Sequence, residues 1–163
     1  MTTQKEAHLA TIRSIRAEML QLLDGMDYCL DWKPDPGSWS AREVAYHLLD
    51  TPPGGVHRVL RGMLSGTVRE YDLWADRSNM NALRQGYDTE RVRQDIGGFF
   101  QGMEEAVGAA AEEDFAGKST LAHLRTRGRD ETRTAQMLLE GLFARHWREH
   151  LGQIKALREA LGV

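Results

Sequence analysis

The ten residues that begin at Trp39 read WSAREVAYHL and contain a complete signal for the start of an α-helix. Ser40 is a good N-cap, and Glu43 follows three residues later, which is the capping-box pattern. Trp39 precedes the cap and can pack on Val44 as a hydrophobic staple. His47 lies three residues from Val44 and so shares the apolar face of the helix. We therefore predict a helix that directs one histidine into the protein interior.

A histidine pair stands near the C-terminus in the string HWREH, residues 146–150. His146 and His150 are four residues apart, so on a helix their side chains lie on one face, one turn above the other. The spacing predicts a long helix from about Thr132 to Leu161. Its inner line combines apolar residues with this pair: Ala135, Leu139, Leu142, His146, His150, Ile154, Leu157 and Leu161. We expect both imidazoles to face the interior.

Two further helices complete the expected set. Apolar residues recur at steps of three and four near the N-terminus: Leu9, Ile12, Ile15, Met19, Leu22, Leu23 and Met26. Asp88 can cap another helix with a similar stripe: Val92, Ile96, Phe99, Met103, Val107 and Ala110. Four amphipathic helices predict an all-α four-helix bundle, and 163 residues suit a single domain that spans residues 1–163.

Glycine and proline mark the places where the helices stop. The cluster PDPG, residues 34–37, ends the first helix, and PPGG, residues 52–55, predicts a kink or break about one turn after His47. Residues 65–87 and residues 113–131 are expected to be long connections, the second with at most one helical turn.

The composition excludes several classes of function. A net charge of −3 and an isoelectric point near 6.1 argue against a nucleic-acid or anionic membrane surface, because phosphates require a basic footprint. No apolar run approaches the ~20 residues that a membrane helix needs, and the N-terminal residues lack a secretory core. The single cysteine, Cys29, forms no internal disulfide. We expect a cytoplasmic protein.

The inward-facing histidines predict a metal site. Two imidazoles buried side by side each need a partner, and their joint protonation is disfavoured. A shared divalent cation, such as zinc, nickel or iron, removes both problems by using neutral nitrogens of His146 and His150 as ligands. His47 would supply a third ligand from the second helix. Three histidines leave one position open for water, a thiolate or an oxyanion, as in catalytic rather than structural sites.

The same residues also fit roles without a metal. One imidazole of the pair can be a satisfied core residue while the second reaches water. The string HWREH also matches the H-x-x-E-H pattern of inverted zinc proteases, but too few residues follow His150 to supply their downstream ligand. Glu149 can act as a general base beside the metal, or it can form a solvated pair with Arg145. The remaining histidines are expected to be surface or packing residues: His8, His57 and His123.

Two segments resemble signatures of the DinB-like family, whose members are also described as YfiT-like or damage-inducible. WSAREVAYHL resembles the second-helix signature of that family, and HWREHLGQI, residues 146–154, resembles its last-helix signature, H-x-x-x-H-x-x-Q-I. The resemblance implies an up-up-down-down four-helix bundle, often a homodimer, with metal ligands at His47, His146 and His150. The chain departs from many relatives at Glu149, where they carry a further histidine.

The resemblance also suggests activities. Similar proteins include bacillithiol S-transferases and mycothiol-dependent maleylpyruvate isomerases. We therefore expect a divalent-metal-dependent enzyme that acts on a small molecule, by hydrolysis or by transfer of a low-molecular-weight thiol, with Glu149 as the candidate catalytic base. The alternative is a non-catalytic bundle that binds a metal or a ligand in a stress response.

Overall fold

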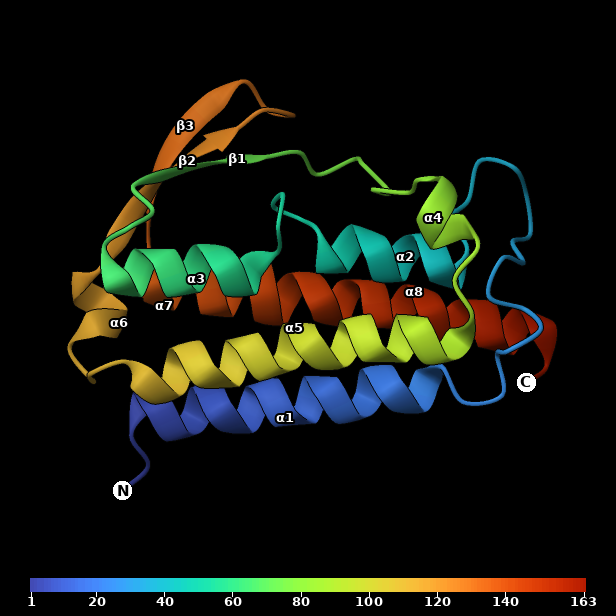
Figure 1. The fold of residues 1–163 in the computed structure, drawn as a ribbon, viewed down its shortest axis with the longest axis horizontal. Helices are drawn as coiled ribbons and strands as arrows, with labels where there is room; N and C mark the ends of the chain where they lie inside the picture. The colour runs from blue at the N-terminus through green and yellow to red at the C-terminus, as the bar shows by residue number, and fades with distance from the viewer.

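The computed structural model describes residues 1–163 and shows a bundle of long helices with a small sheet along one side (Figure 1). The bundle consists of α1 (Gln4–Leu22), α2 (Ala41–Leu49), α3 (Val56–Ser65), α5 (Thr89–Ala109) and a final continuous rod. This rod comprises α7 (Ala135–Met137), the π-helical segment η1 (Leu138–Arg145) and α8 (His146–Leu161). The connections contain β1 (Glu70–Leu73), α4 (Ala82–Gln85), α6 (Asp114–Gly117), β2 (Ser119–Leu124) and β3 (Arg129–Thr134).

The capping box predicted at Ser40 is confirmed. The Ser40 side chain accepts a hydrogen bond from the Glu43 backbone N–H at 3.2 Å, and Glu43 Oε1 accepts from the Ser40 N–H at 3.2 Å. The predicted break after His47 is also present, since residues 50–55 separate α2 from α3. Together α2 and α3 form one interrupted helix of the bundle (Figure 1).

Contacts at the helix ends establish the direction of α1 relative to its neighbours. The backbone N–H of Gln4, at the start of α1, donates to Glu112, just beyond the end of α5, at 2.6 Å. Arg158, near the end of α8, donates to the Leu22 carbonyl at the end of α1, at 2.9 Å. Helix α1 is therefore antiparallel to α5 and parallel to α8.

Contacts further along the chain show that α2, α3 and α5 run in the same direction. Tyr46 in α2 donates to Asp95 at 2.7 Å, and the His57 ring in α3 packs on Phe99 with centroids 4.9 Å apart. The helices therefore run up, down, down and up along the chain. The expected up-up-down-down order is wrong, because the parallel neighbours are the second and third helices, joined by residues 66–88.

The expectation of an all-α fold requires a correction as well, because both long connections contribute to a three-stranded sheet of order β1-β2-β3. Strand β1 pairs with β2 in parallel, with Glu70 opposite Leu121, and β2 pairs with β3 as an antiparallel hairpin. The last helix also begins later than Thr132, because β3 continues to Thr134. The Thr134 side chain then caps α7 by accepting from the Met137 N–H at 3.1 Å.

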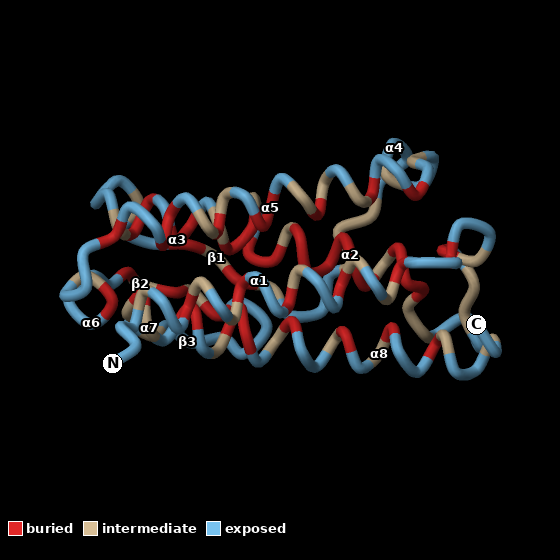
Figure 2. Tube along the Cα trace, turned by 90° about the horizontal axis from the view of Figure 1, so that it is seen from below, coloured by how far each residue is buried: buried red, intermediate tan, exposed pale blue.

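The buried residues lie on the inner sides of the helices (Figure 2). They form one core cluster of 39 hydrophobic residues. Its centre contains an aromatic group contributed by α5 and the last rod: Phe99, Phe100, Phe143 and Trp147. The inward face of the sheet closes the cluster with Tyr71, Leu73, Ala122 and Leu124. Trp147, which lies between His146 and Arg148 in the sequence, is completely buried in this group.

We predict that Ser40→Ala lowers the free energy of unfolding by about 1 kcal/mol, because it removes the N-cap acceptor of α2. Urea unfolding followed by circular dichroism measures the effect. Ser14→Ala is the matched control: Ser14 is exposed within α1, and alanine favours a helix interior. Equal stabilities of the two variants would contradict a stabilising cap at Ser40.

Candidate metal centre

Three imidazoles from α2 and α8 converge on one point. His47 is completely buried, and His146 and His150 are partly buried. One ring nitrogen from each of the three lies within 4.8 Å of the other two. The closest approach is 3.0 Å, between Nε2 of His47 and Nε2 of His146. The structure thus brings together all three histidines that the sequence selects.

Hydrogen bonds on the outer side of two rings decide which nitrogen is free. His47 Nδ1 lies 2.6 Å from the Arg77 carbonyl oxygen, which can only accept, so Nδ1 carries the proton. His150 Nδ1 likewise donates to Gln153 Oε1 at 2.8 Å. In both rings Nε2 is left with a lone pair. Such second partners orient metal-binding histidines and increase their basicity.

Burial keeps His47 and His146 uncharged at neutral pH. Desolvation lowers the pKa of His47 to about 4, against a smaller opposite effect of the Arg77 carbonyl. Desolvation and then the neighbouring His150 and His47 lower the pKa of His146 to about 3. Neutral imidazole is the form that binds metal ions.

The donor set fits a divalent cation. Without one, His146 can donate from Nε2 to the lone pair on His47 Nε2 at 3.0 Å, but its buried Nδ1 is then left with no hydrogen-bond partner. A cation bound by the converging nitrogens would accept their lone pairs and so offset the cost of burying them close together. Three imidazoles suit zinc and several first-row transition metals, so the donor set defines a divalent metal and not its identity.

Aromatic and polar neighbours hold His47 in position. The Trp39 ring packs against the core and lies over His47, with centroids 4.7 Å apart, and over His150 at 6.1 Å. Asn79 donates from its amide to the carbonyls of Tyr46 and His47, at 3.2 and 3.3 Å, and so secures the C-terminal end of α2.

Neither Arg77 nor Asn79 is predicted from the sequence as a support of the site. Arg77 acts through its backbone carbonyl, which every residue type possesses. Asn79 has a φ of 61°, and asparagine is one of the few residues that tolerate this left-handed conformation. This conformational preference is the only feature of the sequence that could have indicated a structural role for Asn79.

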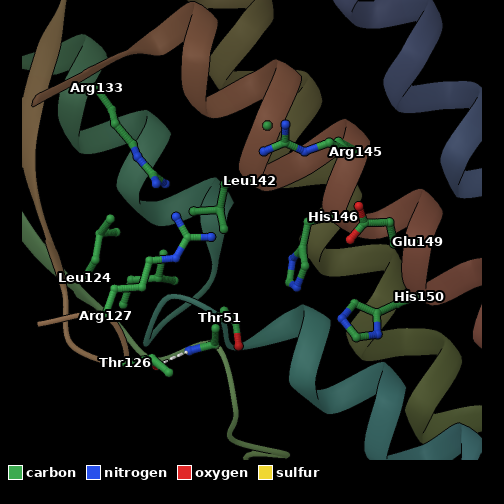
Figure 3. A pocket seen from close by; sticks show the side chains of 13 residues that line it. Thr51, Leu124, Thr126, Arg127, Arg133, Leu142, Arg145, His146, Glu149 and His150 are labelled. Atoms are coloured by element: carbon green, nitrogen blue, oxygen red, sulfur yellow. Dashed lines mark hydrogen bonds between the residues drawn. The ribbon is translucent and has the colours of Figure 1, made fainter. Parts of the chain in front are cut away.

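Glu149 is exposed and lines the same cavity as His146 and His150 (Figure 3). The expected alternative, a pair between Glu149 and Arg145, is wrong, because neither side chain has an oppositely charged partner within 4 Å. Glu149 is therefore available to the cavity, as a catalytic base requires.

The other histidines lie outside the cluster, each with its own neighbours. His8 is bonded to Gln136 at 2.7 Å, His57 packs on Phe99, and His123 is bonded to Asp130 at 2.8 Å. The prediction that these three are packing or surface residues agrees with these positions.

The fold and the site together define a helical bundle with a three-imidazole cluster that opens onto a cavity. The sequence profile of the DinB superfamily matches residues 7–154, and the chain belongs to this superfamily. No curated protein matches the chain. None of its helices is both long and apolar enough to cross a membrane.

Among solved structures, the chain is similar to YfiT from Bacillus subtilis, which is described as a probable metal-dependent hydrolase with an unusual four-helix bundle topology. The TM-score is 0.71 at 17% sequence identity, over 98% of this chain and 88% of YfiT. At this identity the similarity establishes the fold.

We predict that Asn79→Ala lowers the free energy of unfolding by about 1–3 kcal/mol, because it leaves polar groups at the end of α2 without their donor. Asn79→Gly removes the same amide, but glycine adopts the positive φ without strain. Its loss of unfolding free energy should therefore be smaller than that of Asn79→Ala by about 1 kcal/mol. Urea unfolding of the two variants separates the hydrogen bonds from the backbone conformation. Wild-type stability in both would rule out a supporting role for Asn79.

Proposed function

We propose that this protein is a divalent-metal-dependent enzyme that hydrolyses a small molecule, with His47, His146 and His150 as the metal ligands. The convergence of three imidazole nitrogens within 4.8 Å of one another is the observation that carries the proposal. Two of these rings also have a hydrogen-bond partner on their outer nitrogen, as ligand histidines usually do.

The surroundings of the cluster favour catalysis over a purely structural metal. Structural zinc sites are closed by four protein ligands, whereas three ligands leave a position for water or substrate. The cluster lies at the edge of a cavity of about 600 Å³, within the range of small-molecule sites. His146 and His150 both line this cavity.

A divalent cation held here would supply Lewis acidity, which polarises a carbonyl and makes water more acidic. The chain's own residues supply the remaining functions. Glu149 lines the cavity and would accept the proton of the attacking water, then return it to the leaving group. Trp39 packs against the His47 and His150 rings and so helps to fix their orientation.

We predict that the purified protein retains about one divalent ion per chain and that His146→Ala and His150→Ala lose it on dialysis. Elemental analysis by plasma mass spectrometry measures the metal content and identifies the metal. His123→Ala is the control, because His123 lies outside the cluster. Circular dichroism confirms that each variant is folded. Unchanged metal content in both cluster variants would refute the site.

We further predict that Glu149→Gln lowers kcat for hydrolysis by about 10²–10⁴-fold and leaves the metal content unchanged, because it removes only the base. The measurement is steady-state turnover on a panel of small esters and amides, with Glu159→Gln as the control on the same helix. A parallel panel with low-molecular-weight thiols tests thiol transfer, since a thiolate can occupy the open position. Metal-loaded protein that is inactive in both panels would instead support a non-catalytic metal-binding bundle.

A further inference from the structure

The walls of the cavity beside the three histidines come from the last rod, from the sheet with its adjoining segments, and from Thr51 between α2 and α3. The last rod contributes residues from Gly141 to His150, and the sheet contributes Leu73, Leu124 and the β2–β3 hairpin. The small sheet therefore faces the candidate metal centre across the cavity (Figure 3). Its side chains are placed to contact whatever occupies that space.

Three arginines line this cavity. Arg127 lies in the turn between β2 and β3, Arg133 lies on β3, and Arg145 is the last residue of η1, directly before His146. Figure 3 shows side chains of all three around the space next to His146. Glu149 is the only carboxylate among the lining residues. The cavity is thus lined with positive charge in a chain whose net charge is −3.

Two of the three arginines are free to bind a ligand. Arg133 is engaged by Glu131, at 2.9 Å. Arg127 and Arg145 have neither a carboxylate within 4 Å nor a side-chain hydrogen bond to any protein atom. Both neighbouring hairpin arginines, in contrast, have acidic partners: Arg125 pairs with Asp72 at 2.6 Å and Arg129 with Glu131 at 3.9 Å.

The guanidinium group is suited to recognising planar or tetrahedral oxyanions, because its donors form a fixed fork that fits a carboxylate or phosphate. Two unpaired guanidiniums at one cavity also strengthen the local potential that attracts an anion. A neutral substrate would give neither group a partner.

We infer that the substrate is a small anionic molecule whose carboxylate or phosphate group is bound by Arg127 and Arg145 while its reacting bond lies at the three histidines. This inference rests on the proposed function, because the histidine cluster defines the reacting end. The sheet then acts as a specificity element, since it carries Arg127 to the mouth of the helical bundle.

The test is calorimetric titration of the metal-loaded protein with three probes: succinate, methylphosphonate and neutral succinamide. We expect saturable binding of at least one of the two anions and no binding of succinamide. Succinate and methylphosphonate distinguish a carboxylate site from a phosphate site. Arg127→Ala and Arg145→Ala should each weaken the binding of the anion by about tenfold or more.

Matched controls come from the same hairpin and the same helical rod. Arg129→Ala changes a hairpin arginine that does not line the cavity, and Arg148→Ala changes an exposed α8 arginine that lies outside it. Both should bind the anion as the wild type does. Metal content, measured on every sample, shows that a loss of anion binding in Arg127→Ala or Arg145→Ala does not reflect a loss of metal.

The outcomes separate this inference from the proposed function. Three results with metal-loaded protein would contradict an anionic substrate: no binding of either anion, equal binding of succinamide, or unchanged anion binding in Arg127→Ala and Arg145→Ala. None of these results would contradict the metal site. If the protein takes up no divalent metal but still binds the anion through Arg127 and Arg145, the anion site is supported and the metal-dependent hydrolase is refuted.

Discussion

The structure depends on the close approach of two uncharged imidazoles, His47 on α2 and His146 on α8. Their Nε2 atoms lie 3.0 Å apart between the two helices, and the His47 ring is completely buried. A buried pair of this kind is tolerated only when both rings are neutral and their nitrogens find partners, and the protein's own groups leave His146 Nδ1 without one. The Arg77 carbonyl provides a partner for the outer nitrogen of His47, which directs its remaining lone pair towards α8. The site is therefore determined as much by the outer hydrogen bond as by the histidines themselves.

The helices and the three histidines can be predicted from sequence because their signals are local. A capping box spans four residues, and an i, i+4 pair on a helix shares a face whatever the rest of the fold does. The pairing of β1 with β2 has no such signal, since it joins Glu70 to Leu121 and needs contacts distant in sequence. Strand β3 reads RDETRT, and with no apolar residue it lacks the alternation that indicates a half-buried strand. The sequence therefore predicts a metal site but not the wall that faces it.

The π-helical segment η1 is likewise predicted from sequence as ordinary α-helix. Its apolar residues keep a spacing that suits either form, because the difference lies in the i→i+5 backbone bonds and not in residue type. The segment ends at Arg145, so the change back to α-helical bonding falls at His146. Short π-helical segments are frequent at functional sites. Here the irregular turn coincides with the place where an arginine and a histidine line one cavity.

The order of the helices explains why the connections carry parts of the site. Because α3 and α5 are parallel, the chain must return along the whole bundle before α5 can begin. This distance is about 30 Å, the length of a helix such as α5. This return passes along α3 and α2 (Figure 1) and contains β1, Arg77 and Asn79. In an up-down bundle with tight turns, no segment would cross α2 to bond His47 or to pair with a strand near the cavity. The parallel arrangement thus places the Arg77 carbonyl beside His47. It also places β1 where it can pair with β2 of the hairpin that carries Arg127.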